Sequence, residues 1–399
     1  SAILTLFYPL NYEPHMNPED EISKILTELI ALPSSFPPGD TEAISAYTAK
    51  RLKKAGYQTD IYSRSPPINN VVAKMGSGAP SIVFNAHTDT IAIGDDAEWE
   101  TEPFSATKID DRIYGLGAGN CKGAMAVQIW LAEEIARRGG PNSGEVVFTF
   151  VGDEENLGPN GLCYLREEGI VKPDVLICGA QTQLQAIFEE RGVIWVEVTT
   201  TGMSAHAGEP QNGDNAISRM VRLINRLERN LAPVLAKRRR GALCSTMNIG
   251  IIKGGINTNA VPSQCRIEID RRLLPEESIE EAVSEIEDAL LGAKEPRDTW
   301  SVNLLTGTKG FSSPIDTPSV SAFQDAITNI TGEPIVDVVA IGASDARYFA
   351  EDGIVAMTFG PGRAEDGHKP NEFVSAIELG KAGLIQLSVV SEVLGLESG

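Results

Sequence analysis

The sequence is poor in basic residues, and it lacks long apolar runs. Lys and Arg together number 34 against 55 Asp and Glu, so the formal net charge is −21. This surplus of acid argues against nucleic acid or an anionic membrane as a partner, because both repel negative charge. No apolar run approaches the roughly 20 residues that a membrane-spanning helix needs. The composition favours a soluble protein whose binding site would attract a cation.

Cysteine is also scarce, and its spacing shows no pairing. The five cysteines, an odd total, lie at positions 121, 163, 178, 244 and 265. Cys178 and Cys265 fall in apolar, strand-like runs, which favours buried free thiols over disulfides. We therefore expect a cytoplasmic protein, because the cytoplasm keeps thiols reduced.

The chain is long enough for two domains with full hydrophobic cores, at 399 residues of which 42% are hydrophobic. Residues 1–16 look like a tag or a disordered N-terminus, and we leave them out of the fold. Strands alternate with helices over 17–192 and again over 307–399, which predicts one α/β domain built from both segments. The stretch between them, 193–306, has a different pattern and predicts an inserted domain.

The inserted stretch follows the order strand, helix, strand, strand, helix, strand. This βαββαβ order predicts a ferredoxin-like module. Its predicted strands cover 193–200, 243–252, 264–271 and 299–305, and its predicted helices cover 215–230 and 278–291.

An acidic triplet, Asp153-Glu154-Glu155, follows the β-branched and aromatic run 146–151. Such a run predicts a buried strand, and open α/β sheets carry their chemistry at the carboxyl ends of strands. An isolated acidic triplet is more often a solvated turn. Three adjacent acids repel one another, however, and a nearby cation is the simplest reason to tolerate them. Two of only four histidines, His87 among them, have similar strand-end settings, which favours a metal site.

Further motifs occur along the chain in one order. They are His87-x-Asp89, a Gly-rich turn with Lys122-Gly123, Asp153-Glu154-Glu155, Gly202-Met-Ser-Ala-His206, Gly254-Gly255 with Asn259-Ala-Val-Pro262, Asp270-x-Arg272, Ser344-Asp345-Ala346-Arg347, and Phe359-Gly360-Pro361-Gly362 leading to His368-x-Pro370-Asn371-Glu372. Over roughly residues 17–395, this series resembles the aminoacylase, acetylornithine deacetylase and carboxypeptidase G family of metallohydrolases. The resemblance implies a zinc-peptidase-like α/β catalytic domain with a dinuclear metal site. It also implies that the inserted ferredoxin-like domain is a lid through which two chains form a homodimer, or a higher homo-oligomer.

The resemblance assigns metal ligands to four positions: His87, Asn120, Glu155 and His368. His87 would bind the first metal through a ring nitrogen, and Asp89 would accept a hydrogen bond from that ring and orient it. Glu155 and His368 match ligands of the second metal. By itself, a histidine at a strand end is more often a satisfied surface or core residue, so the assignment depends on the whole series of motifs.

Three positions match catalytic residues of the family: Glu154, Asp89 and His206. Glu154 matches the general base, which takes a proton from metal-activated water and returns it to the leaving nitrogen. Asp153 is then structural, with its side chain pointing away. His206 belongs to the predicted lid, where it would reach the partner subunit's site and hydrogen-bond the developing oxyanion. A loop residue without a catalytic role is the alternative for His206.

Three positions match substrate-binding residues: Arg272, Asn259 and Gly342. Arg272 aligns with the residue that clamps a substrate carboxylate, a bidentate task suited to a guanidinium group. The adjacent Arg271 is expected to face solvent. The substrate is therefore expected to be a small molecule that carries a carboxylate.

The sequence departs from the family pattern at two positions. The metal-bridging aspartate of the family falls on Asn120, and the remaining carboxylate of the first metal falls on Ala180 or, one place on, Gln181. Neither substitute is acidic, and two metals a few ångströms apart need anionic bridging to offset their mutual repulsion. We therefore expect one labile divalent transition metal ion per subunit, zinc or manganese, or none, rather than a stable pair.

Three functions remain open. One is a hydrolase that cleaves an activated C–N bond, such as the hydrolytic deamination of nitroanthranilate, in which negative charge moves onto ring substituents and less Lewis acidity is needed. The second is a conventional N-acyl amino acid deacylase or dipeptidase. The third is a non-catalytic binding relative with a degraded metal site. Retention of Glu154 beside the metal ligands argues against the third, since a binder has no use for a base there.

Overall fold

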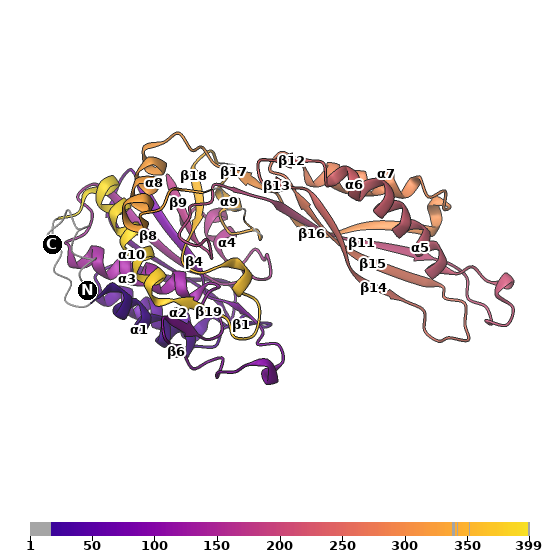
Figure 1. Cartoon of the computed structure of the whole chain (residues 1–399), viewed down its shortest axis with the longest axis horizontal. Coiled ribbons are helices and arrows are strands. Elements are labelled where there is room, and N and C mark those ends of the chain that lie inside the picture. Colours follow the sequence, from indigo (N-terminus) through magenta and orange to yellow (C-terminus); the bar gives the residue numbers. More distant parts are fainter. Residues whose placement is uncertain (1–16, 337–339, 341, 351, 398–399) are drawn as a thin grey trace. The chain divides into compact units, whose positions relative to one another are not determined.

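The computed structural model describes residues 17–336, 340, 342–350 and 352–397, and the predicted tag-like or disordered segment 1–16 lies outside this set. The chain forms two units (Figure 1). The first consists of the described residues up to Phe188 together with those of 313–340 and 344–397. The second is Glu189–Ser312, with which Gly342 and Ala343 are grouped. The predicted insertion, 193–306, falls inside the second unit.

A six-stranded mixed sheet lies at the centre of the first unit (Figure 1), in the order β18-β9-β4-β8-β3-β2. Its strands are β2 (Gln58–Ser65), β3 (Ile68–Ser77), β4 (Ser81–His87), β8 (Gly144–Val151), β9 (Val175–Gly179) and β18 (Val355–Phe359). The strands β18, β9, β4 and β8 are parallel, whereas β3 and β2 are antiparallel to their neighbours. Every residue of β4 is buried, which is typical of a parallel strand covered on both faces. The carboxyl ends of four parallel strands therefore meet at one edge.

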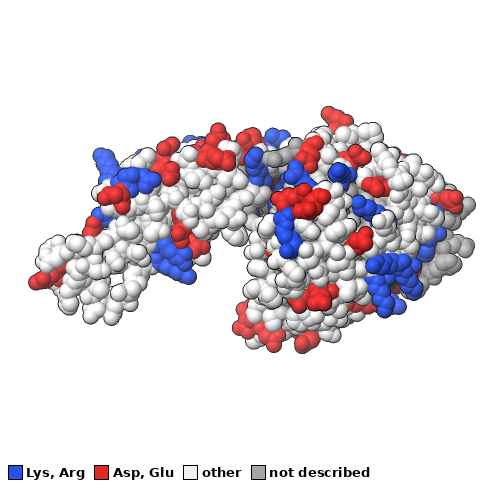
Figure 2. All heavy atoms as spheres, turned by 180° about the vertical axis from the view of Figure 1, so that it is seen from behind, with Lys and Arg blue, Asp and Glu red and all other residues white. Residues whose placement is uncertain are grey.

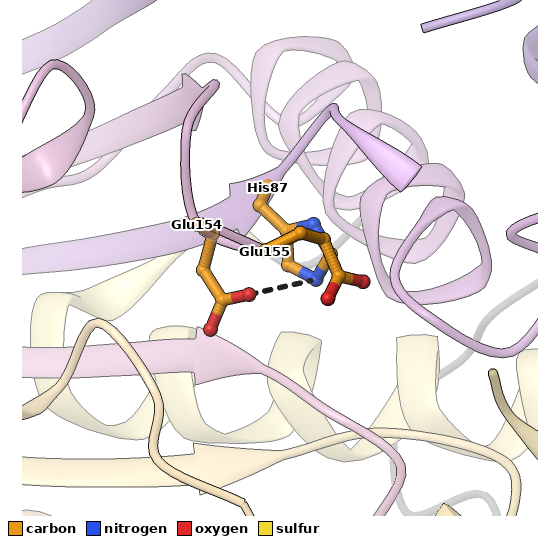
Figure 3. A group of neighbouring side chains, drawn as sticks. All are labelled: His87, Glu154 and Glu155. Atoms are coloured by element: carbon orange, nitrogen blue, oxygen red, sulfur yellow. Dashed lines mark ion pairs between the residues drawn. The ribbon is translucent and has the colours of Figure 1, made fainter. Parts of the chain in front are cut away.

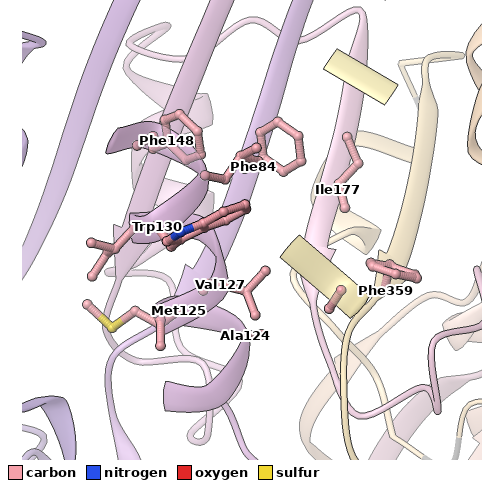
Figure 4. Packing of buried hydrophobic residues seen from close by; sticks show 14 of the residues in the cluster. Phe84, Ala124, Met125, Val127, Trp130, Phe148, Ile177 and Phe359 are labelled. Atoms are coloured by element: carbon pink, nitrogen blue, oxygen red, sulfur yellow. The ribbon is translucent and has the colours of Figure 1, made fainter. Parts of the chain in front are cut away.

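The helices of the first unit are α1 (Pro18–Ile30), α2 (Glu42–Lys54), α3 (Lys122–Arg137), α4 (Leu162–Glu167), α8 (Pro318–Thr331), α9 (Arg347–Ala350) and α10 (Ala376–Val390). Helix α3 contacts α1, α2 and α10 together with the strands β4 and β8, whereas α8 packs on α10 and α4 on α9. Trp130 of α3 lies beside Phe84 and Phe148 in the core (Figure 4), and these two rings stack at 5.3 Å. Gly383 of α10 permits this packing, because a Cβ there would come within 2.8 Å of the Trp130 ring.

Short strands and turns that the sequence did not predict complete the first unit. They are β1 (Ser35–Phe36), β5 (Thr90–Ile91), β6 (Thr107–Ile109), β7 (Arg112–Tyr114), β19 (Phe373–Ser375), the 3-10 turns η2 (Asp96–Glu98) and η6 (Ala364–Asp366), and the π-helical turn η7 (Ser391–Gly395). The strands β19, β7 and β6 form an antiparallel sheet. This sheet brings the segment after His368 next to the loop that precedes Asn120, since Gly115 N donates to Glu372 O at 3.1 Å.

The second unit contains a four-stranded antiparallel sheet in the order β14-β15-β11-β16. Its main elements are β11 (Gly192–Thr201), α5 (Ala216–Arg226), the π-helical turn η4 (Leu227–Leu231), α6 (Ala232–Leu235), β14 (Thr246–Gly254), β15 (Gln264–Leu273), α7 (Ile279–Leu291) and β16 (Trp300–Thr308). Its short elements are β10 (Glu189–Glu190), η3 (Pro210–Asn212), β12 (Arg239–Arg240), β13 (Leu243–Cys244), η5 (Arg297–Thr299) and β17 (Phe311–Ser312). The main elements follow the βαββαβ order, which confirms the predicted ferredoxin-like module.

Arg271 is buried, so the prediction that it faces solvent is wrong. Side chains along β15 alternate between the two faces of the sheet, and Arg271 shares the buried face with Ile267 and Ile269. Its side chain is 0% exposed, and its Nη2 lies 2.8 Å from both Glu277 and Glu285. These carboxylates offset the burial of the charge.

Among the described helices, none combines the length and the apolar character needed to cross a membrane.

Candidate metal and catalytic site

The candidate site lies at the carboxyl ends of β4 and β8, which are parallel neighbours. His87 ends β4 opposite Val151, the last residue of β8, and Thr88 N donates to Val151 O at 2.7 Å. Glu154 and Glu155 lie in the loop that follows β8. Figure 3 shows the side chains of His87, Glu154 and Glu155 pointing toward one another, and one potential ligand atom from each lies within 4.8 Å of the others.

His87 is buried and presents one nitrogen to the site. Its Nδ1 lies 2.9 Å from the main-chain oxygen of Asp89, so Nδ1 carries the proton and Nε2 keeps a lone pair. The carboxylate of Asp89, predicted to orient this ring, lies farther away at 3.6 Å. It accepts instead from Glu155 N at 3.1 Å. Asp89 thus holds the ring with its main chain and the acidic loop with its side chain.

The lone pair of His87 Nε2 faces oxygen atoms. Asn120 Oδ1 lies 3.3 Å away and Glu154 Oε2 lies 3.8 Å away. In the neutral ring, whose Nδ1 donates to Asp89, no proton lies between Nε2 and either oxygen, so these contacts become attractive only with a second ring proton or a bound cation. Burial opposes the second proton, but the neighbouring acidic groups outweigh it and raise the pKa of His87. A cation would serve in its place, because all three atoms are metal-ligand types.

Asn120, Glu155 and His368 form the other half of the site. Asn120 Nδ2 lies 2.8 Å from both Glu155 Oε1 and His368 Nε2, and these two atoms are 3.0 Å apart. His368 Nε2 would have to accept a hydrogen bond from Asn120 and donate one to Glu155, and a single ring nitrogen cannot do both at once. A cation bound by His368 and Glu155 would remove the need for a proton between these two atoms.

Within each half of the site, the separation suits two ligands of one divalent cation. Neighbouring ligands around a tetrahedral zinc ion lie about 3.3–3.6 Å apart, given metal–ligand distances of roughly 2.0–2.2 Å. The observed separations are 3.3 Å for His87–Asn120 and 3.0 Å for Glu155–His368. The amide oxygen of Asn120 faces His87, while its NH2 group faces Glu155 and His368. An amide in this orientation has no lone pair for a second ion, which favours one ion over a bridged pair.

Gln181, rather than Ala180, reaches the metal-ligand loops. A Cβ on Gly119 would come within 2.2 Å of Gln181 Nε2, and one on Gly367 would come within 2.5 Å of Gln181 Oε1. These glycines are the chain neighbours of Asn120 and His368. The side chain that the fold places here is neutral, so it adds no negative charge to the site.

Glu154 is held as a poorly solvated carboxyl group. Its side chain is 13% exposed, and burial raises its pKa well above the usual carboxyl range, with His87 opposing and Glu155 adding to the shift. A cation held by the neighbouring ligands would oppose the shift, because positive charge favours the carboxylate. Asp153, by contrast, is turned into its own loop, as the sequence predicts, where it accepts from Asn160 N at 3.0 Å and Asn160 Nδ2 at 2.7 Å.

Two buried residues near Glu154 had no role predicted from the sequence. Asp345 and Arg347 have 4% and 3% exposed side chains and lie 4.0 Å apart. Arg347 favours the charged form of Glu154, and Asp345 disfavours it. The sequence shows them as part of the Ser344–Arg347 motif, but only the fold shows that both charges are buried beside the acidic loop.

In the second unit, His206 and Asn259 lie in neighbouring exposed loops. His206 pairs with Ala260 in an isolated bridge, and Ala207 N donates to Asn259 O at 3.0 Å. His206 Nδ1 accepts from Gly208 N at 3.0 Å, so its Nε2 is left to carry the proton. The fold thus brings the two predicted lid residues together, and among the described residues none accepts from the N–H of His206.

Arg272 lies on the face of β15 opposite to Arg271. Its Nε lies 2.8 Å from Asp270 Oδ1, and its Nη2 lies 3.1 Å from Asp270 Oδ2. A carboxylate therefore already occupies the planar fork of this guanidinium. Gly342 is exposed.

The sequence model described as peptidase family M20/M25/M40 matches residues 83–390. The chain belongs to this family. Its members are metal-dependent hydrolases of amide and peptide C–N bonds, and the chain is therefore an enzyme of this class. The family confirms the resemblance found in the motifs.

Two relatives and one solved structure show the extent of the similarity. An N-formyl-4-amino-5-aminomethyl-2-methylpyrimidine deformylase of Halalkalibacterium halodurans is 28% identical over 393 residues, which cover 90% of this chain and 91% of that protein. An acetylornithine deacetylase of Aliivibrio fischeri is 28% identical over 348 residues, which cover 86% and 89%. A dinuclear metal-binding peptidase of family M20 from Bacillus subtilis superposes with a TM-score of 0.71 at 16% identity, covering 94% and 98%. The last comparison confirms the fold.

Proposed function

We propose that the protein removes a short acyl group from the nitrogen of a small molecule, with Glu154 as the general base. A single divalent ion, zinc or manganese, would be held by four ligands: His87, Asn120, Glu155 and His368. When bound, such an ion supplies Lewis acidity at the scissile carbonyl. The observation that carries the proposal is the position of Glu154. Its carboxyl group lies beside the four proposed ligands, 3.8 Å from His87 Nε2.

Glu154 has the environment of a proton carrier. Burial favours its protonated form, so it can hold the proton that it takes from water and then deliver it to the leaving nitrogen. Water supplies hydroxide to the acyl carbon, the C–N bond breaks, and the amine leaves with the proton held by Glu154. A carboxyl group that stayed fully ionised would return the proton less readily.

The relatives support a short acyl group. One is named for removing a formyl group and the other for removing an acetyl group. Neither is named for the deamination of an aromatic amine, so the nitroanthranilate reaction is not our proposal. A dipeptide is the alternative substrate, since it presents the same amide bond.

We propose that Arg272 binds a substrate carboxylate, with Asn259 and Gly342 contributing to the substrate site. The support is the geometry of Arg272, whose fork already holds the carboxylate of Asp270 in two contacts. A substrate carboxylate would compete with Asp270 for this fork, as bidentate recognition allows.

We also propose that the protein is a homodimer formed through the second unit, and that His206 donates to the oxyanion in the partner's site. The edge strand β14 pairs with β15 on one side, and it exposes Ile251 and Ile252 by 39% and 57%. An exposed apolar edge of this kind invites a second chain. The free N–H of His206 suits an oxyanion donor.

Nucleic acid and membrane are not among the proposed partners. On the face shown in Figure 2, Lys and Arg side chains lie in small groups separated by acidic or uncharged residues. Nucleic-acid-binding surfaces instead gather basic side chains into a continuous patch. The five free cysteines keep the cytoplasm as the proposed location, since a reducing compartment preserves them.

A substrate screen with metal control tests the proposed function. The panel contains N-formyl and N-acetyl amines, each with and without a carboxylate, together with dipeptides and nitroanthranilate. We expect turnover of short N-acyl compounds, loss of turnover after dialysis against a chelator, and recovery on adding zinc or manganese. Release of ammonia from nitroanthranilate without hydrolysis of any amide would contradict the proposal.

A further inference from the structure

Glu372 is a buried carboxylate that binds a loop rather than a cation. Glu372 as a whole is 1% exposed. Its Oε1 accepts from Gly119 N at 2.9 Å and Asn120 N at 2.6 Å, and its Oε2 accepts from Gly117 N at 3.2 Å. Three main-chain N–H groups thus converge on one carboxylate, which is the arrangement of an anion-binding nest. The chain itself supplies the anion.

The glycines of this loop permit such a close approach. Gly117 has φ +79°, a left-handed conformation that favours glycine. A Cβ on Gly119 would come within 3.0 Å of Glu372 Oε1 and within 2.2 Å of Gln181 Nε2. The main chain of Glu372 adds a fourth contact, because its oxygen accepts from Gly115 N at 3.1 Å. The segment 115–120 is therefore bound to Glu372 along its length.

The same short segment carries a candidate ligand of its own. His368 lies four residues before Glu372. Between them, both the oxygen and the nitrogen of the Asn371 side-chain amide form hydrogen bonds with the main chain. Asn371 Oδ1 accepts from Glu100 N at 2.7 Å, and its Nδ2 donates to Glu98 O at 3.0 Å. Glu372 thus joins the loop that ends in Asn120 to the segment that carries His368, two parts of the chain about 250 residues apart.

We propose that Glu372 is a positioning residue, which sets the spacing of Asn120 and His368 before any metal ion binds. This inference deepens the proposed function and rests on the metal site proposed there. The carboxylate is needed because it offers only acceptors to three N–H donors. A glutamine at this position would offer one acceptor oxygen and would turn an NH2 group toward at least one donor. The loop would then be held by fewer contacts, and Asn120 would lose its fixed position.

Amide hydrogen exchange in the unaltered, metal-free protein tests the first half of this proposal. The amides of Gly117, Gly119 and Asn120 should be protected before any ion is added, because Glu372 holds them without it. Adding zinc should change their protection little. If these amides exchange freely until the ion binds, then the metal orders the loop, and the positioning role of Glu372 is overturned.

Zinc affinity of the Glu372→Gln variant tests the second half. Its zinc affinity, measured by titration calorimetry, should fall about 10–100-fold, as is usual when a group that orients a metal ligand is lost. Protection of the three amides in the metal-free variant should fall as well. Glu372→Asp serves as a second variant, since it keeps the charge but shortens the reach, and it should show a smaller loss of both.

The matched control is Asp111→Asn. Asp111 contacts Ser375, the last residue of β19, whereas Glu372 directly precedes the first residue of that strand. Asp111 also accepts from the main chain, since Ile377 N donates to its Oδ1 at 3.0 Å. Among the described residues its hydrogen bonds go to residues 375–377, outside both ligand-bearing loops. Its variant should keep wild-type zinc affinity. Equal losses in Asp111→Asn and Glu372→Gln, or no loss in either, would overturn the proposal. If the unaltered protein binds no zinc, the metal site fails and the positioning role fails with it, while the exchange of the three amides still shows what holds the loop.

Discussion

In the first unit the candidate site residues contact one another, whereas in the second each contacts its own strand or a neighbouring loop. In the first unit, the side-chain amide of Asn120 lies within 3.3 Å of His87, Glu155 and His368. In the second unit, Arg272 pairs with Asp270 two residues away. The first unit thus brings the proposed metal ligands and the proposed base together within one chain, while the second holds its proposed substrate and oxyanion residues on β15 and in exposed loops. The predictions below test this contrast.

The largest expected effect is on the general base. Glu154→Gln keeps the size of the side chain but removes the proton acceptor, so turnover should fall by about 10²–10⁴-fold. Metal binding should persist, because Glu154 is not among the proposed ligands. Kinetics together with elemental analysis of the same sample check both parts.

Asp153→Asn is the matched control for the base. It makes the same chemical change one residue earlier, where the carboxylate faces Asn160 rather than the site. Asparagine also tolerates the left-handed φ of +69° at this position. We expect turnover close to that of the unaltered protein. A loss as large as that in Glu154→Gln would show that neutralising the acidic loop, rather than removing a base, abolishes activity.

Substitutions of the two adjacent arginines of β15 should have different effects: one on the stability of the fold, the other on substrate binding. Arg271→Met leaves Glu277 and Glu285 without their buried partner, and the free energy of unfolding should fall by about 3 kcal/mol. This lies at the lower end of the usual range because Arg238 still pairs with both carboxylates. Arg272→Met should leave stability within about 1 kcal/mol and should instead raise KM for substrates that carry a carboxylate. Denaturant unfolding and kinetics on matched substrates, with and without a carboxylate, measure the two effects.

Restoring an acid at the bridging position should tighten the metal site. Asn120→Asp replaces a dipole by a full charge between His87 and Glu155, so metal affinity should rise by about tenfold or more. The change also removes the conflict at His368 Nε2, since an aspartate does not donate. Calorimetric titration with zinc measures the affinity, and an unchanged or weaker affinity would mean that Asn120 does not adjoin the ion. Turnover of the natural substrate need not rise.

Mixed dimers test whether His206 of the second unit acts in the partner's site. The recovered activity is the smallest effect expected here. His206→Ala and Glu154→Gln should each be inactive alone. If His206 serves the partner's site, a mixed dimer contains one site with both groups intact, and mixing should recover up to about half of normal activity per dimer. No recovery despite demonstrated subunit exchange would place His206 in its own subunit's site or outside catalysis.

The site residues at strand ends, His87 and the acidic triplet 153–155, could be predicted from the sequence, because an apolar run directly before each indicates where a buried strand ends. The apolar runs before His87 and Asp153 read as buried strands, and the structure ends β4 at His87 and β8 at Val151. The position of His368 could not be derived in this way. It depends on β19 pairing with β7, about 260 residues away in sequence, and a three-residue strand has no periodicity to read. The family resemblance, rather than the pattern, identified His368.

Arg271 shows where a readable pattern was misjudged. The alternation of Cys265, Ile267 and Ile269 already assigns Arg271 to the buried face of β15. A buried arginine is rare without partners, so solvent was the expected environment. Its partners, Glu277 and Glu285, come from a turn and a helix farther along the chain. Only the packed structure shows that they meet it.

The most direct test of the account is the number of metal ions per chain. The unaltered protein, loaded with zinc or manganese and dialysed against buffer and then against a chelator, is analysed for metal content at each step. Asn120 cannot bridge two ions and Gln181 adds no charge, so we predict at most one ion per chain before the chelator and none after it. Two ions per chain that survive the chelator would contradict the account.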